Sequence, residues 1–133
     1  MPDAPFSFDI QPQLATPIYR QVVEQVQRLV AGGQLKPGDD LPSVRAVAER
    51  HAINPMTVSK AYSLLEAEGL LARRRGVGMV VAEGVRPAGD DRMALLQPAL
   101  LALARQARQL GITPDQALDA LAQAFHSNDQ DNA

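Results

Sequence analysis

An N-cap residue followed directly by proline occurs three times in this chain of 133 residues, at Thr16-Pro17, Asn54-Pro55 and Thr113-Pro114. Each pair favours a helix start, because the cap side chain accepts a hydrogen bond from the first turn and proline already has helical φ. The three pairs therefore predict three helices with defined starts, and they constrain the fold more than any other feature of the sequence.

The first of these helices has an amphipathic pattern. Its apolar face consists of Ile18, Val22, Val26 and Leu29. Gly32-Gly33 ends the pattern. Pro37 and Gly38 then occupy the two central positions of a predicted type II turn, before a short apolar link through Leu41. Ser43 is the expected cap of a second, short helix.

The helix that begins at Asn54-Pro55 has two chemically different faces, at about 100° per residue. The packing face comprises Val58, Ala61, Tyr62 and Leu65. The opposite face comprises Met56, Ser59, Lys60 and Ser63. An apolar inner face with short polar and basic outer residues is typical of a helix that reads DNA in the major groove.

Residues 70–81 predict two short strands around a glycine-containing turn, and the hairpin carries Arg73, Arg74 and Arg75 at its tip. Taken alone, such a triplet is explained by a solvated turn. Directly after an amphipathic helix it favours phosphate or minor-groove contact, and Gly76 allows close backbone approach. Strand alternation puts Arg73 and Arg75 on one side and Arg74 on the other, so at most part of the triplet faces DNA.

The order helix, helix, helix, hairpin within the first 82 residues is that of a winged helix-turn-helix. We therefore expect a mainly α-helical fold with a small β-hairpin wing, and a DNA-binding domain over residues 1–83. Phe6, Phe8 and Ile10 alternate with polar residues, which predicts a short strand or extended arm whose apolar side docks on this domain.

Charge is distributed unevenly along the chain. The net charge is −2 and the pI about 5.6, so the bulk composition gives no sign of nucleic-acid binding. Between Ser43 and Gly76, however, six basic residues face three acidic ones, and residues 87–133 hold three basic against six acidic residues. The basic surface is therefore expected to be local, on the winged domain.

The remaining chain predicts a linker over residues 84–91, a helical dimerisation region over 92–126 and a disordered polar tail over 127–133. Spacings of three and four along the first helix indicate a seam that packs on a partner copy. We expect Pro98 to kink or split that helix, and Thr113 with Gln116 to form a capping box for the last one. The predicted dimerisation residues are Met93, Leu96, Leu100, Leu103, Ala107, Leu110, Leu118, Leu121 and Phe125.

Other classes of protein find little support. The chain has no cysteine, and His51 and His126 stand alone, so no metal site is expected. Gly76-Val77-Gly78 lacks the further glycine of a dinucleotide fingerprint, which leaves no sign of an enzyme or a cofactor. The longest apolar run is too short to span a membrane, and the first residues do not resemble a signal peptide, so we expect a cytoplasmic protein.

The segments Leu35 to Arg45, Ile53 to Tyr62, Glu68 to Leu71 and Arg74 to Gly78 resemble the GntR family of bacterial transcription regulators. The resemblance covers most of residues 6–82, and the short helical remainder is similar to the YtrA subfamily. It implies a homodimeric repressor, or sometimes a dual regulator, that binds an inverted repeat in double-stranded DNA. Two helices do not readily enclose a small-molecule effector. Regulation would then depend on a ligand bound between subunits or on the dimer equilibrium alone.

Matching positions assign DNA contact to residues of the second helix, the third helix and the wing. Arg74 is added because it lies at the hairpin tip. The predicted DNA-contacting residues are thus Ser43, Arg45, Asn54, Thr57, Ser59, Lys60, Arg74, Arg75 and Gly76. Some branches of the family have arginines where Pro55 and Ser59 stand here, so their base contacts do not transfer to this chain, and Arg45 is expected to take more of the base recognition.

The alternative is a winged helix that docks on protein, with the basic hairpin meeting an acidic partner. Binding of duplex DNA, and its dependence on salt, distinguishes the two functions.

Overall fold

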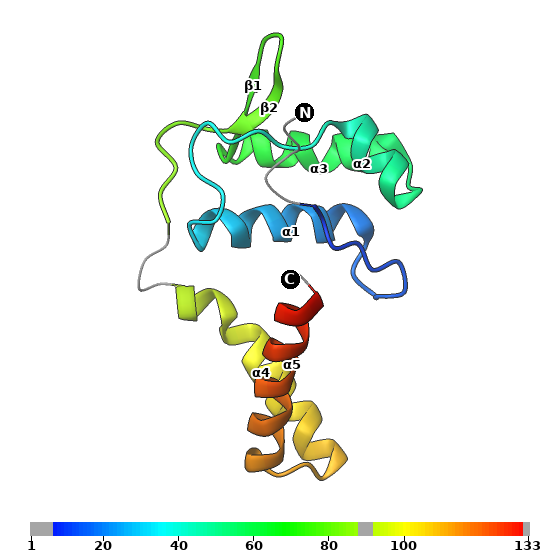
Figure 1. Ribbon diagram of the computed structural model, residues 1–133, viewed down its shortest axis with the longest axis vertical. Coiled ribbons are helices and arrows are strands. Elements are labelled where there is room, and N and C mark those ends of the chain that lie inside the picture. Colours follow the sequence, from blue (N-terminus) through cyan, green and yellow to red (C-terminus); the bar gives the residue numbers. More distant parts are fainter. Residues whose placement is uncertain (1–6, 88–91, 132–133) are drawn as a thin grey trace. The chain divides into compact units, whose positions relative to one another are not determined.

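The computed structural model describes residues 7–87 and 92–131 and forms two compact units, Met1–Arg92 and Met93–Ala133 (Figure 1). Unit 1 contains helices α1 (Ile18–Ala31), α2 (Val44–His51) and α3 (Pro55–Ala67), followed by strands β1 (Leu71–Arg74) and β2 (Gly78–Val81). Helices α4 (Arg92–Leu110) and α5 (Pro114–Asp131) follow. The predicted mainly α-helical fold with a hairpin wing is confirmed. Phe6 and residues 88–91 of the predicted linker lie outside the described residues.

Side-chain caps begin two of the three helices in unit 1. Ser43 Oγ accepts a hydrogen bond from the Ala46 N–H at 3.0 Å, and Asn54 Oδ1 accepts one from the Met56 N–H at 2.8 Å. The prediction for Thr16 is wrong, because Pro17 is the N-cap of α1 and no side chain caps that helix. The Thr16 carbonyl instead accepts a hydrogen bond from the Gln21 side chain at 2.9 Å.

The core of unit 1 is apolar and joins all of its elements. The largest fully buried side chains, contributed by α1, α3, β1 and β2, are Val22, Val26, Val58, Leu65, Leu71 and Val81. The whole packing face predicted for α3 is buried. Burial of this face leaves the opposite side of α3 in solvent, where it is available for contact with a ligand.

The N-terminal arm packs on this core, as predicted, and runs in an extended conformation without forming a strand. Phe8 is buried and its ring lies 6.4 Å from that of Tyr62, between centroids. Two glutamines of α1 hold the arm: Gln25 pairs with the backbone of Asp9, and Gln21 pairs with the backbone of Gln11.

The wing is an antiparallel hairpin with Leu71 opposite Val81 and Arg74 opposite Gly78. It follows α3 directly and projects beyond the helices of unit 1 (Figure 1). A third segment, residues 38–41, pairs with the other edge of β2 through the Asp40–Val80 bridge. The sequence predicts only a turn and a link there. This added pairing fixes the base of the wing on both sides.

Unit 2 is a pair of helices joined by a short turn. Thr113 and Gln116 form the predicted capping box, with reciprocal hydrogen bonds of 2.9 and 3.2 Å. Helix α4 is continuous through Pro98, so the predicted split does not occur. The predicted disordered tail is also wrong from residue 127 to Asp131, because α5 continues to that residue. Residues 132–133 lie outside the described part of the chain.

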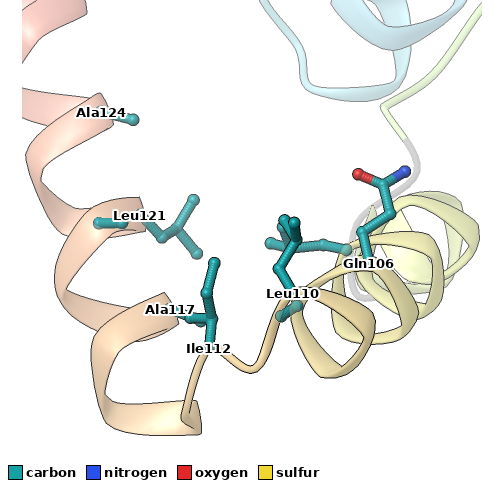
Figure 2. A pocket seen from close by; sticks show the side chains of 9 residues that line it. Gln106, Leu110, Ile112, Ala117, Leu121 and Ala124 are labelled. Carbon is teal, nitrogen blue, oxygen red and sulfur yellow. The ribbon is translucent and has the colours of Figure 1, made fainter.

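Residues of α4, of α5 and of the turn between them line an apolar hollow within unit 2. It comprises two adjoining pockets of about 300 and 380 Å³, which share Leu103, Ala107 and Leu121 among their lining residues. Figure 2 shows Leu110, Ile112 and Leu121 around the smaller pocket.

Neither α4 nor α5, nor any other helix in the described ranges, is long and apolar enough to cross a membrane.

Candidate nucleic-acid interface

The outward face of α3 is exposed along its length. Ser59 and Lys60 are both exposed and immediately follow Val58, which is fully buried. Thr57 is half-buried, and its N–H donates to the Asn54 carbonyl at 2.9 Å. The face is therefore a row of short polar groups with one cation on a helix whose other side is fixed in the core.

The two helix caps contribute polar groups at the starts of α2 and α3. Both Ser43 and Asn54 are exposed, and each uses its side-chain oxygen to accept a backbone N–H of its own helix. The hydroxyl proton of Ser43 and the amide protons of Asn54 take no part in these caps. Each cap residue can thus orient its helix and also donate a hydrogen bond to an anionic oxygen.

Arg45 forms an ion pair on α2. Its Nε lies 3.1 Å from Oε1 of Glu49, one turn later, and the side chains are 87% and 69% exposed. An exposed pair of this kind contributes little to stability. The carboxylate nevertheless offsets the positive charge of Arg45 before any DNA is present.

The wing tip presents its arginines to solvent. A hydrogen bond from the Val77 N–H to the Arg74 carbonyl closes a turn at 3.0 Å, with Gly76 at φ +80°. A positive φ at this position requires glycine or strains any other residue. Arg75 is exposed beside Gly76, whereas Arg74 is half-exposed and lies 4.0 Å from Glu83.

Lys60 makes a contact that its sequence position does not reveal. Its Nζ lies 4.0 Å from the centroid of the Tyr19 ring in α1, the geometry of a cation–π interaction. The long side chain is therefore supported at one flank of the outward face of α3, on the side of α1.

Two titratable side chains near these elements have shifted pKa values. Burial raises the pKa of Tyr62, whose hydroxyl donates to the Pro42 carbonyl at 2.6 Å. Partial burial, followed by the neighbouring Arg50, lowers the pKa of His51, and Asp9 opposes that effect. Tyr62 therefore ties α3 to the segment that leads into α2, which agrees with its predicted role in the core.

The predicted dimerisation residues lie on α4 and α5, and they differ in exposure. Ala107 is buried within unit 2, and it lines the same hollow as Leu103 and Leu121. The large side chains of this set that remain exposed are Met93, Leu96, Leu103, Leu110, Leu118, Leu121 and Phe125. Part of the predicted seam thus faces the companion helix of the same chain, and most of its large residues remain in solvent.

Three features of the interface were not among the predicted site residues. Tyr19 supports Lys60, Glu83 lies beside Arg74, and Met56 is highly exposed on α3. The alternating faces of α3 already put Met56 outward, so that signal was present in the sequence. The contacts of Tyr19 and Glu83 join residues 41 and 9 positions away in the chain, and no local pattern encodes them.

Comparison with known proteins gives consistent results. The family described as bacterial regulatory proteins, gntR family, matches residues 18–81. The HTH-type transcriptional repressor YtrA of Bacillus subtilis is 39% identical over 104 residues, which cover 77% of this chain and 80% of that protein.

Two solved structures are also similar. YtrA from Sulfolobus acidocaldarius, a GntR-family transcription factor, has a TM-score of 0.54 and 30% identity, and the match covers 90% of this chain and 97% of that one. The DNA-binding domain of AraR in complex with operator ORX1 has a TM-score of 0.50 and 26% identity, covering 58% and 99%. The chain is therefore a transcription regulator with a DNA-binding winged helix and not an enzyme, and it belongs to the YtrA-like branch of the GntR family.

Proposed function

We propose that this regulator is a homodimeric repressor that binds an inverted-repeat operator, one half-site for each protomer. The observation that carries this proposal is the exposed polar face of α3, which contains Ser59 and Lys60 and lies directly opposite a wholly buried apolar face. The operator complex of the similar AraR domain and the name of the similar YtrA repressor support the same function.

In this proposal α3 lies in the major groove and the wing contacts the flanking backbone or minor groove. Thr57, Ser59 and Lys60 act from α3, with Asn54 at its start. Ser43 and Arg45 act from the first turn of α2, and Arg45 takes part in base recognition. The wing contributes Arg74, Arg75 and Gly76, with Arg75 as its principal phosphate contact because Arg74 lies near Glu83.

The dimer is proposed to form through α4 and α5. Exposed apolar side chains of this size and number on two helices favour burial against a second copy. Leu118 is 64% exposed and Phe125 is 66% exposed, and both lie on the last helix. Two such helices from each protomer can form a bundle whose core neither pair completes alone.

We propose that a single chain does not enclose an effector. DNA binding is then controlled by a ligand held between subunits or by the dimer equilibrium itself. The proposed role requires the protein to act in the cytoplasm, where the DNA is.

A salt titration with duplex DNA tests the function. Sites are first selected from a randomised duplex library, and the affinity of the full chain is then measured by fluorescence anisotropy at increasing salt. For about eight phosphate contacts per dimer, log affinity should fall with log salt at a slope of roughly −7. Absence of duplex binding at low salt would contradict the proposal and favour a protein-docking function.

Two arginine variants test the division of roles. Arg45→Ala is expected to cost about 1–3 kcal/mol on the selected duplex and less on random duplex, as for a base contact. Arg75→Ala is expected to reduce the affinity for both duplexes alike and to make the dependence of affinity on salt less steep. If Arg45→Ala loses the same affinity for the selected and the random duplex, Arg45 has no role in base recognition.

Sedimentation of matched leucine variants tests the dimer. Leu118→Glu introduces a charge into the proposed interface and is expected to yield a monomer that binds the selected duplex weakly. Leu101→Glu places the same charge on α4 at a leucine of similar exposure, 58%, outside the predicted seam, and should leave the dimer intact. A dimeric Leu118→Glu variant would argue against this interface.

A further inference from the structure

Met56 has the highest exposed fraction, 76%, among the exposed large hydrophobic side chains of the described residues. It lies in the first turn of α3, two residues after the cap Asn54. The neighbouring Val58 is fully buried, so the exposure of Met56 is a property of its face of the helix and not of a loose end.

The backbone at Met56 is held firmly. Its N–H donates to Asn54 Oδ1 at 2.8 Å, and Pro55 occupies the first helical position with a restricted φ. The direction in which the side chain leaves the helix is therefore set by the cap. The thioether chain itself is unbranched and flexible, which suits it to contact an apolar group of small size.

Met56 is the long apolar side chain on the outward face of α3, and its neighbours on that face are polar or charged. Ser59 and Ser63 on that face are short and polar. Lys60 rests on the Tyr19 ring, at the flank toward α1. Apart from Lys60, this face therefore presents two hydroxyl groups, of Ser59 and Ser63, and one thioether, of Met56.

We propose that Met56 contacts the C5 methyl group of a thymine and is a specificity-determining residue of this regulator. The inference rests on the proposed function, in which the N-terminal residues of α3 reach base edges in the major groove. The thymine methyl is the apolar feature that base pairs present there, and it distinguishes thymine from cytosine and from both purines.

Replacement of thymine by deoxyuridine tests this contact, because it removes the methyl group and keeps the base pair. A duplex selected with the full chain is resynthesised with each thymine of one half-site replaced in turn. The wild type should lose about fourfold in affinity at one thymine per half-site, the ratio expected for burying one methyl-sized group. Replacement in both half-sites together should cost about 15-fold.

The variant Met56→Ala should bind thymine and deoxyuridine equally at that position, and Met56→Leu should retain part of the discrimination. Leu14→Ala is the matched control, since Leu14 is a large apolar residue of unit 1 that is 53% exposed and lies outside α3. It should discriminate as the wild type does. The exposure of Met56 predicts melting temperatures close to wild type for all three variants.

The failures of this inference and of the proposed function are distinguishable. If no duplex is bound, the proposed function fails and the inference fails with it. If a duplex is bound but no thymine methyl affects affinity, or if Met56→Ala retains the full discrimination, the inference alone is overturned. A selected half-site that contains no thymine also overturns it.

Discussion

The ammonium of Lys60 rests on the ring of Tyr19, 4.0 Å from its centroid, so a residue of α3, the helix proposed to face DNA, is supported by the first helix of the same unit. The ring face attracts the cation and restricts a side chain that otherwise has four rotatable bonds. A cation held in place loses less entropy when it binds a phosphate. Tyr19 is thus a positioning residue for Lys60.

Removing the ring should weaken binding through Lys60. We expect Tyr19→Leu to reduce affinity for the selected duplex about two- to fivefold, the ratio for a cation–π contact of about 0.5–1 kcal/mol. Tyr19→Phe keeps the ring and should bind nearly as the wild type does. In a Lys60→Met background the Tyr19→Leu change should have no further effect, as a double-mutant cycle by anisotropy would measure. An equal loss in both backgrounds would mean that Tyr19 acts on the fold alone.

Glu49 should restrain DNA binding by pairing with Arg45 at 3.1 Å. Glu49→Gln removes a carboxylate that competes with phosphate for the guanidinium, so we expect tighter binding of duplex DNA, by about two- to fivefold for a gain of 0.5–1 kcal/mol. Asp119→Asn makes the same change of net charge on α5, and within the described residues Asp119 forms no ion pair with an arginine of the wing or of α2. An equal gain in both variants would assign the effect to overall charge.

Ala52 is the non-glycine residue with positive φ, +55°, in the described part of the chain, and it forms the turn between α2 and α3. The left-handed conformation costs about 1–2 kcal/mol for a residue with a Cβ, and the greater entropy of unfolded glycine offsets about 0.5–1 kcal/mol of that. Ala52→Gly should therefore stabilise the protein by up to about 1 kcal/mol in urea unfolding. Ala46→Gly, inside α2, should destabilise it by a similar amount.

Tyr62 makes stability fall at alkaline pH. Its pKa is raised by burial, so above about pH 10 the unfolded chain releases a proton that the folded chain retains. The contribution of this group is present below the ordinary tyrosine pKa and is lost as the pH rises toward the folded value. Tyr62→Phe should lower stability by about 1–2 kcal/mol at neutral pH, because the Pro42 carbonyl loses its donor. Chemical unfolding between pH 8 and 11 should show a smaller decline in the variant.

Gln21 should control the release of the N-terminal arm. It is 5% exposed, and its amide bonds the Gln11 N–H and carbonyl and the Thr16 carbonyl at 2.8–2.9 Å. Gln21→Leu leaves these groups without their partner, at a cost of about 1–3 kcal/mol. Hydrogen exchange of residues 8–12 should become faster in the variant, while exchange in α3 stays slow. Unchanged protection of the arm would mean that Phe8 suffices to hold it.

Local chemistry allowed much of this fold to be predicted. Ser43, Asn54 and Thr113 are caps because each needs only the next few residues to satisfy its oxygen. The two faces of α3 follow from helical periodicity in the same way. The prediction of a disordered tail is wrong for residues 127–131 because polarity alone does not stop a helix, and these residues contain neither glycine nor proline.

The contacts that escaped prediction are long-range. Asp40 pairs with Val80, Gln25 with Asp9 and Lys60 with Tyr19, each across 16 or more positions in the chain. A glutamine amide or a lysine gives no sign in the sequence of which distant backbone or ring it will meet. The candidate DNA-contact residues could be named, but the groups that orient or neutralise them could not.

The base of the wing is held at both of its strands: residues 38–41 bond β2, and the Leu70 N–H, just before β1, bonds the Leu65 carbonyl of α3 at 3.0 Å. The base of the wing and α3 are therefore fixed relative to each other by backbone hydrogen bonds. In the proposed complex, any adjustment of groove width or bend that the contacts of the wing and α3 need must then come from the duplex. Sequences that deform cheaply are then favoured even at base pairs that no side chain touches.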